Sequence, residues 1–421
     1  MSRRLRALPC CAIVLGGLLA SPLVQAEALF VNDATVHTMA RGVVLQNADI
    51  LVRDGRVKAI GRELPVPPDA TVIEADGRPV TPGFFAGISR LGLVEITLEE
   101  PGVAPGQPPA TDLRPEFDAA RDFDPLSSAI PVTRIEGYSW TVLEAARAGS
   151  LIGGQGRAAW LNGAYGAFAG EGILFVNLGD DAAGQTAMPS AAHWMLLEQA
   201  MAEAVSEAPW LPQPLLTLAG RQALARYRSG ALTVFGVDGA ADILQVLGFS
   251  EQHGLKPVIS GGAEAWMVAD RLAEAGVPVV LDPLGNLPAS FDRIGARLDN
   301  AALLHAAGVT IAFGRAGTHN ARKLRQAAGN AVANGLPYEA ALAALTVNPA
   351  MIFELEPLYG TLEEGSRADL VVWSGDPLEV TSVAEQVLIE GKSIPMVSRQ
   401  TLLRDRYLEQ NPSLPRAYIK P

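Results

Sequence analysis

Cysteine is nearly missing from this 421-residue sequence, which has only Cys10 and Cys11, both within the first 26 residues. The 395 residues that follow can form no disulfide, no thiolate metal site and no cysteine nucleophile. A chain of that length can bury a hydrophobic core large enough to be stable without cross-links.

Basic charge and long apolar runs are also scarce. The sequence has 33 Lys and Arg against 45 Asp and Glu, a formal net charge of −12. Removing the three arginines of the first 26 residues leaves 30 basic residues and a net charge of −15. This balance disfavours nucleic acid and anionic membranes as partners. After residue 26, no apolar run is long enough to cross a bilayer.

The first 26 residues have the pattern of a secretory signal peptide. Arg3, Arg4 and Arg6 form a basic head, an apolar run follows, and Val24-Gln25-Ala26 is typical of a cleavage site. The apolar part is short for a spanning helix, although an uncleaved anchor is the alternative. We therefore expect cleavage after Ala26 and a periplasmic or secreted protein.

Hydrophobic patterning after residue 81 alternates between strands and helices. Continuous apolar strands between amphipathic helices predict a parallel sheet covered on both faces, and the length suits a (β/α)8 TIM-like barrel. A doubly wound sheet is the alternative, but no Gly-rich phosphate turn follows a strand. The predicted strands are 141–145, 231–237, 256–260, 277–282 and 309–314, and the predicted helices are 191–208, 240–254, 261–276 and 298–309.

Short strand patterns occur at both ends of the chain, punctuated by Asp-Gly turns at 54–55 and 76–77. The sequence therefore predicts a small β-sandwich domain built from residues 27–80 and 357–421, around a barrel of residues 81–356. A stretch rich in Pro and Asp, 102–128, is expected to form a long loop near the barrel mouth or a plain surface loop.

Five segments together resemble the amidohydrolase superfamily, in its imidazolonepropionase-like exported branch. Residues 48–61 and 80–84 are similar to its opening β segment and entry into the barrel, and 130–156 to its second strand and Gly-Gly-Gln-Gly loop. Residues 319–350 and 360–378 are similar to its last barrel helices and closing β segment. The resemblance covers nearly all of the chain after residue 26.

The resemblance implies hydrolysis of carbon–nitrogen bonds other than peptide bonds, using one or two divalent metals such as zinc. Two ligand histidines would end the first barrel strand, where this sequence has Ile88 and Arg90. A further histidine is expected at Gly236, and the catalytic aspartate at Gly314, which precedes Arg315. We therefore expect no metal ligands at these positions and no bound cofactor.

A count of histidines leads to the same expectation. Three of the five lie on predicted helices, one precedes the barrel, and only His319 follows the end of a strand. A catalytic zinc takes about three protein ligands, so one imidazole cannot hold it. The other four, which we interpret as surface or helix-packing residues, are His37, His193, His253 and His305.

Two arginines would lie at the barrel mouth, at or beside the expected metal-site positions. Arg90 and Arg315 are always charged, so each needs a partner when buried. One interpretation pairs them with Asp238, Glu95 or Glu144. The other makes the two guanidiniums a clamp for a small carboxylate.

Four further residues complete the candidate ligand site. Asp238 follows a predicted strand, Gln155 lies in the Gly-rich loop, and His319 follows the last predicted strand. Glu264 opens a predicted helix, where a carboxylate favours the helix N-terminus without any function. The candidate ligand-binding residues are thus Arg90, Gln155, Asp238, Glu264, Arg315 and His319.

Three functions remain open. The first is a non-catalytic amidohydrolase-like protein that binds a small-molecule ligand, as a homo-oligomer or beside a complete paralogue. The second is an active hydrolase of small amides or N-acyl compounds, with catalytic residues that the sequence does not reveal. The third is a structural subunit of an exported complex. Metal content separates the first two.

Overall fold

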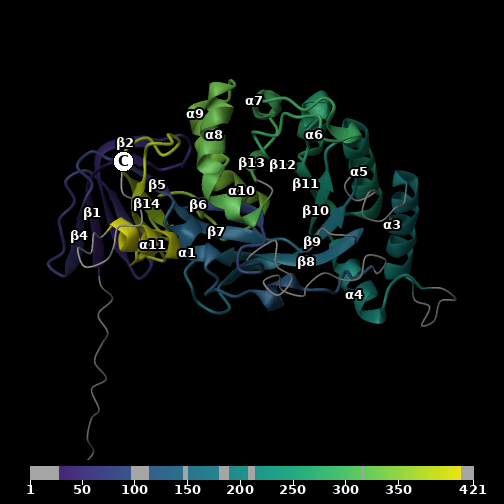
Figure 1. Cartoon of the computed structure of the whole chain (residues 1–421), viewed down its shortest axis with the longest axis horizontal. Coiled ribbons are helices and arrows are strands. Elements are labelled where there is room, and N and C mark those ends of the chain that lie inside the picture. Colours follow the sequence, from purple (N-terminus) through teal and green to yellow (C-terminus); the bar gives the residue numbers. More distant parts are fainter. Residues whose placement is uncertain are drawn as a thin grey trace, which may run out of the picture.

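The computed structural model contains two eight-stranded sheets and their flanking helices (Figure 1). One sheet is made from both ends of the chain, and the other from the middle. No helix in the described part of the chain is long and apolar enough to cross a membrane. The structure describes residues 28–95, 113–145, 150–179, 189–206, 214–314 and 317–408.

The terminal sheet joins segments far apart in the sequence. Its order is β16-β15-β14-β5-β1-β2-β3, with β4 beside β1, and the antiparallel pair β5–β14 connects the two ends of the chain. All eight strands belong to one connected sheet, so the β-sandwich is not confirmed. The strands are β1 (Ala28–His37), β2 (Val44–Arg53), β3 (Arg56–Gly61), β4 (Ala70–Glu74), β5 (Pro79–Pro82), β14 (Leu370–Trp373), β15 (Ala384–Ile389) and β16 (Lys392–Ser393).

The second sheet is a nearly closed barrel whose strands follow one another in chain order. Seven strands run parallel, but β8 runs antiparallel to both β7 and β9. The barrel is therefore TIM-like, with one reversed strand that the sequence pattern did not predict. Its strands are β6 (Phe84–Ser89), β7 (Tyr138–Leu143), β8 (Ile152–Trp160), β9 (Phe168–Asn177), β10 (Leu232–Val237), β11 (Lys256–Gly261), β12 (Val279–Leu281) and β13 (Ile311–Phe313).

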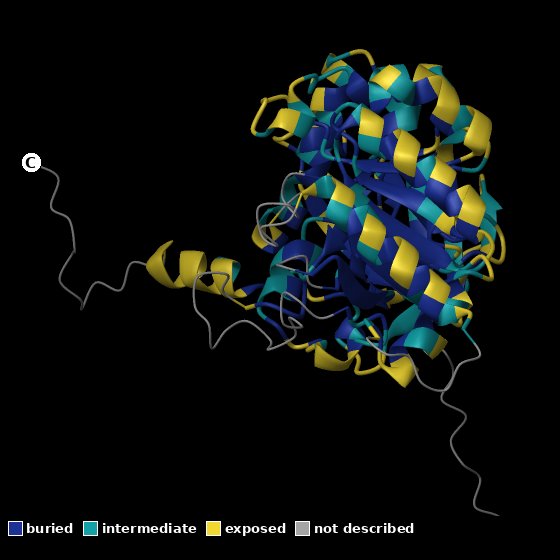
Figure 2. Cartoon of the chain, turned by 90° about the vertical axis from the view of Figure 1, so that its right-hand side faces the viewer, coloured by how far each residue is buried: buried dark blue, intermediate teal, exposed yellow. Residues whose placement is uncertain are grey.

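Helices cover the outside of the barrel sheet, and their exposed stripes face away from its buried strands (Figure 2). α5 ends where Gly254 adopts the left-handed conformation, with φ of 66°, as C-terminal glycines commonly do. The predicted helices at 191–208, 240–254, 261–276 and 298–309 correspond to α3, α5, α6 and α7. The helices are α1 (Ala129–Arg134), α3 (Ser190–Ala204), α4 (Leu218–Tyr227), α5 (Ala240–His253), α6 (Ala269–Ala275), α7 (Asn300–Ala306), α8 (Leu324–Ala333), α9 (Tyr338–Ala343), α10 (Val347–Ile352) and α11 (Arg399–Leu408).

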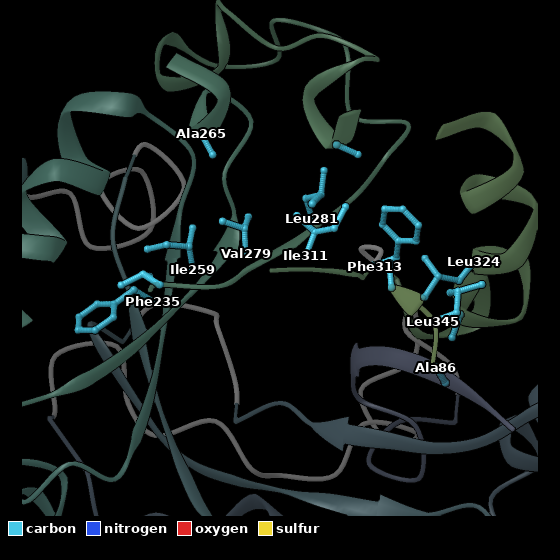
Figure 3. Close-up of a cluster of buried hydrophobic side chains, with 14 of the residues drawn as sticks. Ala86, Phe235, Ile259, Ala265, Val279, Leu281, Ile311, Phe313, Leu324 and Leu345 are labelled. Carbon is cyan, nitrogen blue, oxygen red and sulfur yellow. The ribbon is translucent and has the colours of Figure 1, made fainter. Parts of the chain in front are cut away.

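Alternation along the strands divides the core into two layers. Side chains such as Phe235 and Ile259 face the helices and belong to the cluster drawn in Figure 3. Their neighbours in the sequence point the other way, into the barrel, because successive strand residues face opposite sides. That interior cluster, which we call the barrel core, includes Phe85, Ile88, Val142, Phe175, Val234, Val258, Val280 and Ala312.

A buried charged network lies where the two sheets meet. The Asp369 carboxylate accepts hydrogen bonds from the Tyr359 hydroxyl at 2.8 Å and from the Arg367 Nε at 3.1 Å. Burial raises the pKa of Asp369, while the charge of Arg367 opposes that shift. The Arg367 guanidinium also lies 3.9 Å from the centre of the Trp160 ring. The network ties the start of β14 to the end of β8.

The Gly-Gly-Gln-Gly stretch, 153–156, was expected to form a loop and instead lies inside β8. A Cβ added to Gly156 would be 1.8 Å from the Leu143 carbonyl oxygen, and one on Gly154 would be 2.7 Å from the Phe117 oxygen. Glycine is required here because neighbouring backbone approaches closely on both sides.

We predict that Gly156→Ala lowers the free energy of unfolding by about 3 kcal/mol or more, because the backbone must move to admit a methyl group. Gly248→Ala is the matched control. This α5 position has open space, and alanine should raise the free energy of unfolding by about 0.5–1 kcal/mol. Urea unfolding followed by tryptophan fluorescence measures both. Equal stability of the two variants would disprove the close approach of β7 and β8.

Candidate active site at the barrel mouth

The carboxyl ends of the seven parallel strands meet at one end of the barrel, the position of active sites in TIM-like folds. Ile88 lies on β6 and belongs to the barrel core, and Gly236 shares a face of β10 with Val234. Gly314 follows β13, and a Cβ there would be 3.0 Å from Val280 Cγ1. The implied ligand positions are therefore hydrocarbon and bare backbone, while Gly236 is in register with two buried polar residues, Asn177 of β9 and Ser260 of β11.

The apolar lining continues into the segments beside the mouth. Leu93 and Val94, just beyond β6, are buried in the same cluster as Ile88. Ala119 and Ala120, from a 3₁₀ turn after Asp118, belong to it as well. The hydrophobic barrel core thus includes these adjoining segments.

The donor chemistry at these strand ends does not fit a divalent cation. Such ions bind nitrogen, oxygen or sulfur donors, while Ile88 and the two glycines have no donor side chain and Arg90 is itself a cation. Within the described ranges, no group of three or more His, Asp or Glu residues is placed to hold a metal. The metal centre implied by the resemblance therefore has no matching ligand set in this part of the chain.

Arg90 lies at the mouth, half-buried after the end of β6. Its backbone N–H donates to the Thr318 Oγ1 at 3.3 Å. The Arg90 Nε is shielded from solvent, and no described residue accepts a hydrogen bond from it. Arg315, the second half of the expected carboxylate clamp, lies outside the described residues.

Asp238 follows β10, and its described ion pair is with Arg293 rather than Arg90. The Asp238 Oδ2 is 3.8 Å from the Arg293 Nε, and its Oδ1 accepts from the Ala263 N–H at 3.1 Å. Glu95, another expected partner of Arg90, instead accepts hydrogen bonds from the Ser128 N–H and hydroxyl. Arg293 is a residue at the mouth that the sequence reasoning missed.

The segment that carries Arg293 crosses the mouth between β12 and α7. A Cβ on Gly179 would be 2.7 Å from the Asp292 Oδ2, and one on Gly239 would be 3.2 Å from the Asp292 Cβ. The 3₁₀ turn Phe291–Arg293 therefore packs over the ends of β9 and β10. The sequence does contain a sign of this crossing segment. The turn-rich stretch DPLGNLPAS at 282–290 lies at the end of a predicted strand and indicates a loop there.

Glu264 links two backbone segments. Its Oε2 accepts from the Ala240 N–H, the first residue of α5, at 3.2 Å, and its Oε1 accepts from the Gly295 N–H at 2.8 Å. The sequence placed it at the start of its own helix, but it precedes a 3₁₀ turn and caps α5 instead. A carboxylate is favoured there because the N-terminal N–H groups of a helix lack internal partners.

The remaining candidates lie elsewhere. Gln155 is buried in β8, where its Nε2 donates to the Pro115 oxygen at 2.6 Å and its Oε1 accepts from the Arg226 Nη2 at 2.9 Å. His319 is exposed in a 3₁₀ turn before α8. The structure thus places Asp238 beside Glu264, whose N–H donates to the Asp238 carbonyl oxygen at 3.0 Å, and does not place Gln155 with them.

The other histidines lie on the expected elements. His193 on α3 is fully buried, and burial lowers its pKa, which favours the neutral ring. His253 on α5 lies 2.9 Å from the Glu198 Oε2, and His305 is exposed on α7. His37 ends β1, where burial lowers its pKa. These positions agree with surface or packing roles.

Comparisons with known proteins agree with this fold. Residues 218–396 match the model of the Amidohydrolase family. A solved amidohydrolase from Thermotoga maritima MSB8 is 25% identical with a TM-score of 0.77, and the match covers 88% of this chain and 100% of that one. Amidohydrolase family membership is supported.

Two further likenesses are more limited. A 57-residue stretch is 46% identical to the amidohydrolase tasK of Hapsidospora irregularis, spanning 14% of this amidohydrolase-like chain and 6% of that relative. A prolidase solved with N-methylphosphonate-L-proline is 17% identical with a TM-score of 0.56, covers 87% of this chain and 99% of its own, and shows the fold alone. The imidazolonepropionase-like branch stays a prediction.

We predict that Glu264→Ala lowers the free energy of unfolding by about 1–2 kcal/mol, because two backbone N–H groups lose their acceptor. Glu264→Gln keeps one acceptor oxygen and should lose less. Glu364→Ala, at an exposed turn side chain, is the control and should change little. Urea unfolding measures all three. No loss in Glu264→Ala would show that the carboxylate does not hold these segments.

Proposed function

We propose that this amidohydrolase-family protein has lost its metal ligands and is a non-catalytic binding or partner subunit. The observation that supports it is the apolar barrel core, which includes Ile88 at the end of β6 and brings Val280 beside Gly314. A catalytic metal supplies both a Lewis acid and the bound hydroxide that attacks the substrate. Without the metal ligands, the chain lacks both.

The proposed ligand is a small molecule with a carboxylate, and Arg90 is the residue that would bind it. Guanidinium groups pair with carboxylates through two parallel hydrogen bonds, so they favour this class of ligand. Arg90 is at the mouth, and no described residue accepts from its Nε. The binding partner would be a second copy or a complete paralogue, outside the cytoplasm if residues 1–26 are removed as predicted.

A second candidate is an active hydrolase of carbon–nitrogen bonds in small amides or N-acyl compounds. The match to the Amidohydrolase family and the 25% identity to the T. maritima protein support family membership, which this candidate shares with the first. This candidate requires catalytic groups that the sequence pattern did not identify. Metal content separates the two candidates directly.

We predict less than about 0.1 equivalent of zinc, manganese or iron per chain, since Ile88, Arg90, Gly236 and Gly314 offer no donor at the implied ligand positions. The full chain is purified without chelator, dialysed against metal-free buffer and measured by inductively coupled plasma mass spectrometry. A second sample is incubated with excess zinc and dialysed in the same way. Metal retained near one equivalent in either sample would overturn the non-catalytic proposal.

We predict that Arg90→Gln weakens the binding of N-acetylalanine by about 10-fold or more, since a charge-assisted hydrogen bond contributes about 1.5–3 kcal/mol. Isothermal titration calorimetry measures the dissociation constant. Arg271→Gln, at a 66% exposed α6 side chain, is the control and should bind as the parent does. If the parent gives no heat of binding with either N-acetylalanine or propionate, the proposed carboxylate site is disproved.

A further inference from the structure

The last described helix, α11, has no buried residue. It leaves the body of the molecule, and Figure 2 shows it exposed along its length. Leu403 and Tyr407 lie one turn apart on the same side, with Leu402 next to them, and their exposed fractions are 42%, 80% and 61%. A ten-residue helix is marginal alone in water, so this apolar side is expected to pack on something.

The charge of α11 is opposite to that of the chain. Three arginines and one aspartate give the helix a net charge of +2, in a chain whose formal net charge is −12. An acidic protein surface therefore attracts the helix. An anionic membrane would attract α11 but repel the rest of the molecule, so the charge favours a second copy of this chain.

A groove of suitable chemistry lies between α5 and α6, with a volume of about 680 Å³. Its apolar lining includes Leu244, which is 39% exposed, together with Leu247 and Val277. Glu251, Glu274 and Arg271 also line it, and because Arg271 pairs with Glu274 at 3.6 Å, the lining keeps one net negative charge. Such an apolar groove with acidic residues matches an amphipathic helix with arginines beside its leucines.

The helix and the groove are at opposite ends of one molecule. α11 lies beside α1 and the terminal sheet, whereas α5 and α6 flank the far side of the barrel (Figure 1). The helix therefore cannot reach the groove of its own chain, and a second copy offers the groove. Reciprocal docking of two copies gives a twofold dimer in which each contributes one helix and one groove.

We propose that α11 is a dimerisation arm that packs its Leu402, Leu403 and Tyr407 side into the α5–α6 groove of a second copy. The arginines of the arm then face Glu251, while Glu274 keeps its pair with Arg271. This inference does not depend on whether the barrel mouth is catalytic, because neither surface includes a residue of the mouth.

Size-exclusion chromatography with light scattering on the full chain at about 50 µM tests the arm. The parent should have twice the 44.2 kDa chain mass, and Leu402→Asp and Leu244→Asp should each be monomeric. Leu218→Asp, at a 71% exposed leucine on α4, is the control and should stay dimeric. Because all three leucines are exposed, the substitutions should leave the fold intact, which circular dichroism checks.

A monomeric parent would overturn the proposal, as would a Leu244→Asp variant that stays dimeric. A monomeric parent that sediments with phosphatidylglycerol vesicles through Leu402 would overturn it in favour of a membrane surface. Cross-linking tests the contact directly. With Cys10→Ser and Cys11→Ser, the pair Leu402→Cys and Leu244→Cys should form a disulfide-linked dimer under oxidation, and the pair Leu402→Cys and Leu218→Cys should not.

Discussion

The hydrophobic interior of the barrel, which reaches its mouth, is the constraint on which the chemistry of this protein depends. Ile88 points into the barrel at the end of β6, and Leu93 and Val94 are buried in the same cluster. A divalent cation in such surroundings would lose its hydration without gaining ligands, which is strongly unfavourable. Asn177 and Ser260 interrupt this apolar surface beside Gly236, and Asp238, Glu264 and Arg293 lie beyond β10 and around the segment that follows β12.

Most polar candidates at the mouth hold the fold together. Glu264 caps α5 and accepts a hydrogen bond from the Gly295 N–H. Asp238 accepts one from the Ala263 N–H and forms an ion pair with Arg293. Gln155 uses both ends of its amide inside the protein. Residue type suggested binding or catalysis in each case, but backbone groups at strand and helix ends need partners for folding too. Whether such a polar residue binds a ligand or holds the fold together depends on its contacts, which the sequence does not show.

The sequence predicted the parts of the fold that hydrophobic periodicity controls. The runs at 231–237, 256–260, 277–282 and 309–314 form β10 to β13, because buried parallel strands are continuously apolar. The reversal of β8 was missed, since a strand's direction depends on its neighbours rather than on its own pattern. Arg293 was missed for a related reason: a turn sequence does not show which strand ends the turn will cover.

Arg90 connects the proposed loss of the metal ligands to the proposed binding role. A divalent metal would give the mouth positive charge and would also activate water. A guanidinium keeps the positive charge, since it does not lose its proton at physiological pH, but it cannot generate a hydroxide nucleophile. Under the proposed function, a mouth with Arg90 in place of a metal would attract anionic ligands without a metal-bound hydroxide to hydrolyse them. In the proposed function, binding and catalysis, which a metal would combine, are separated because Arg90 supplies positive charge while Ile88, Gly236 and Gly314 supply no ligand.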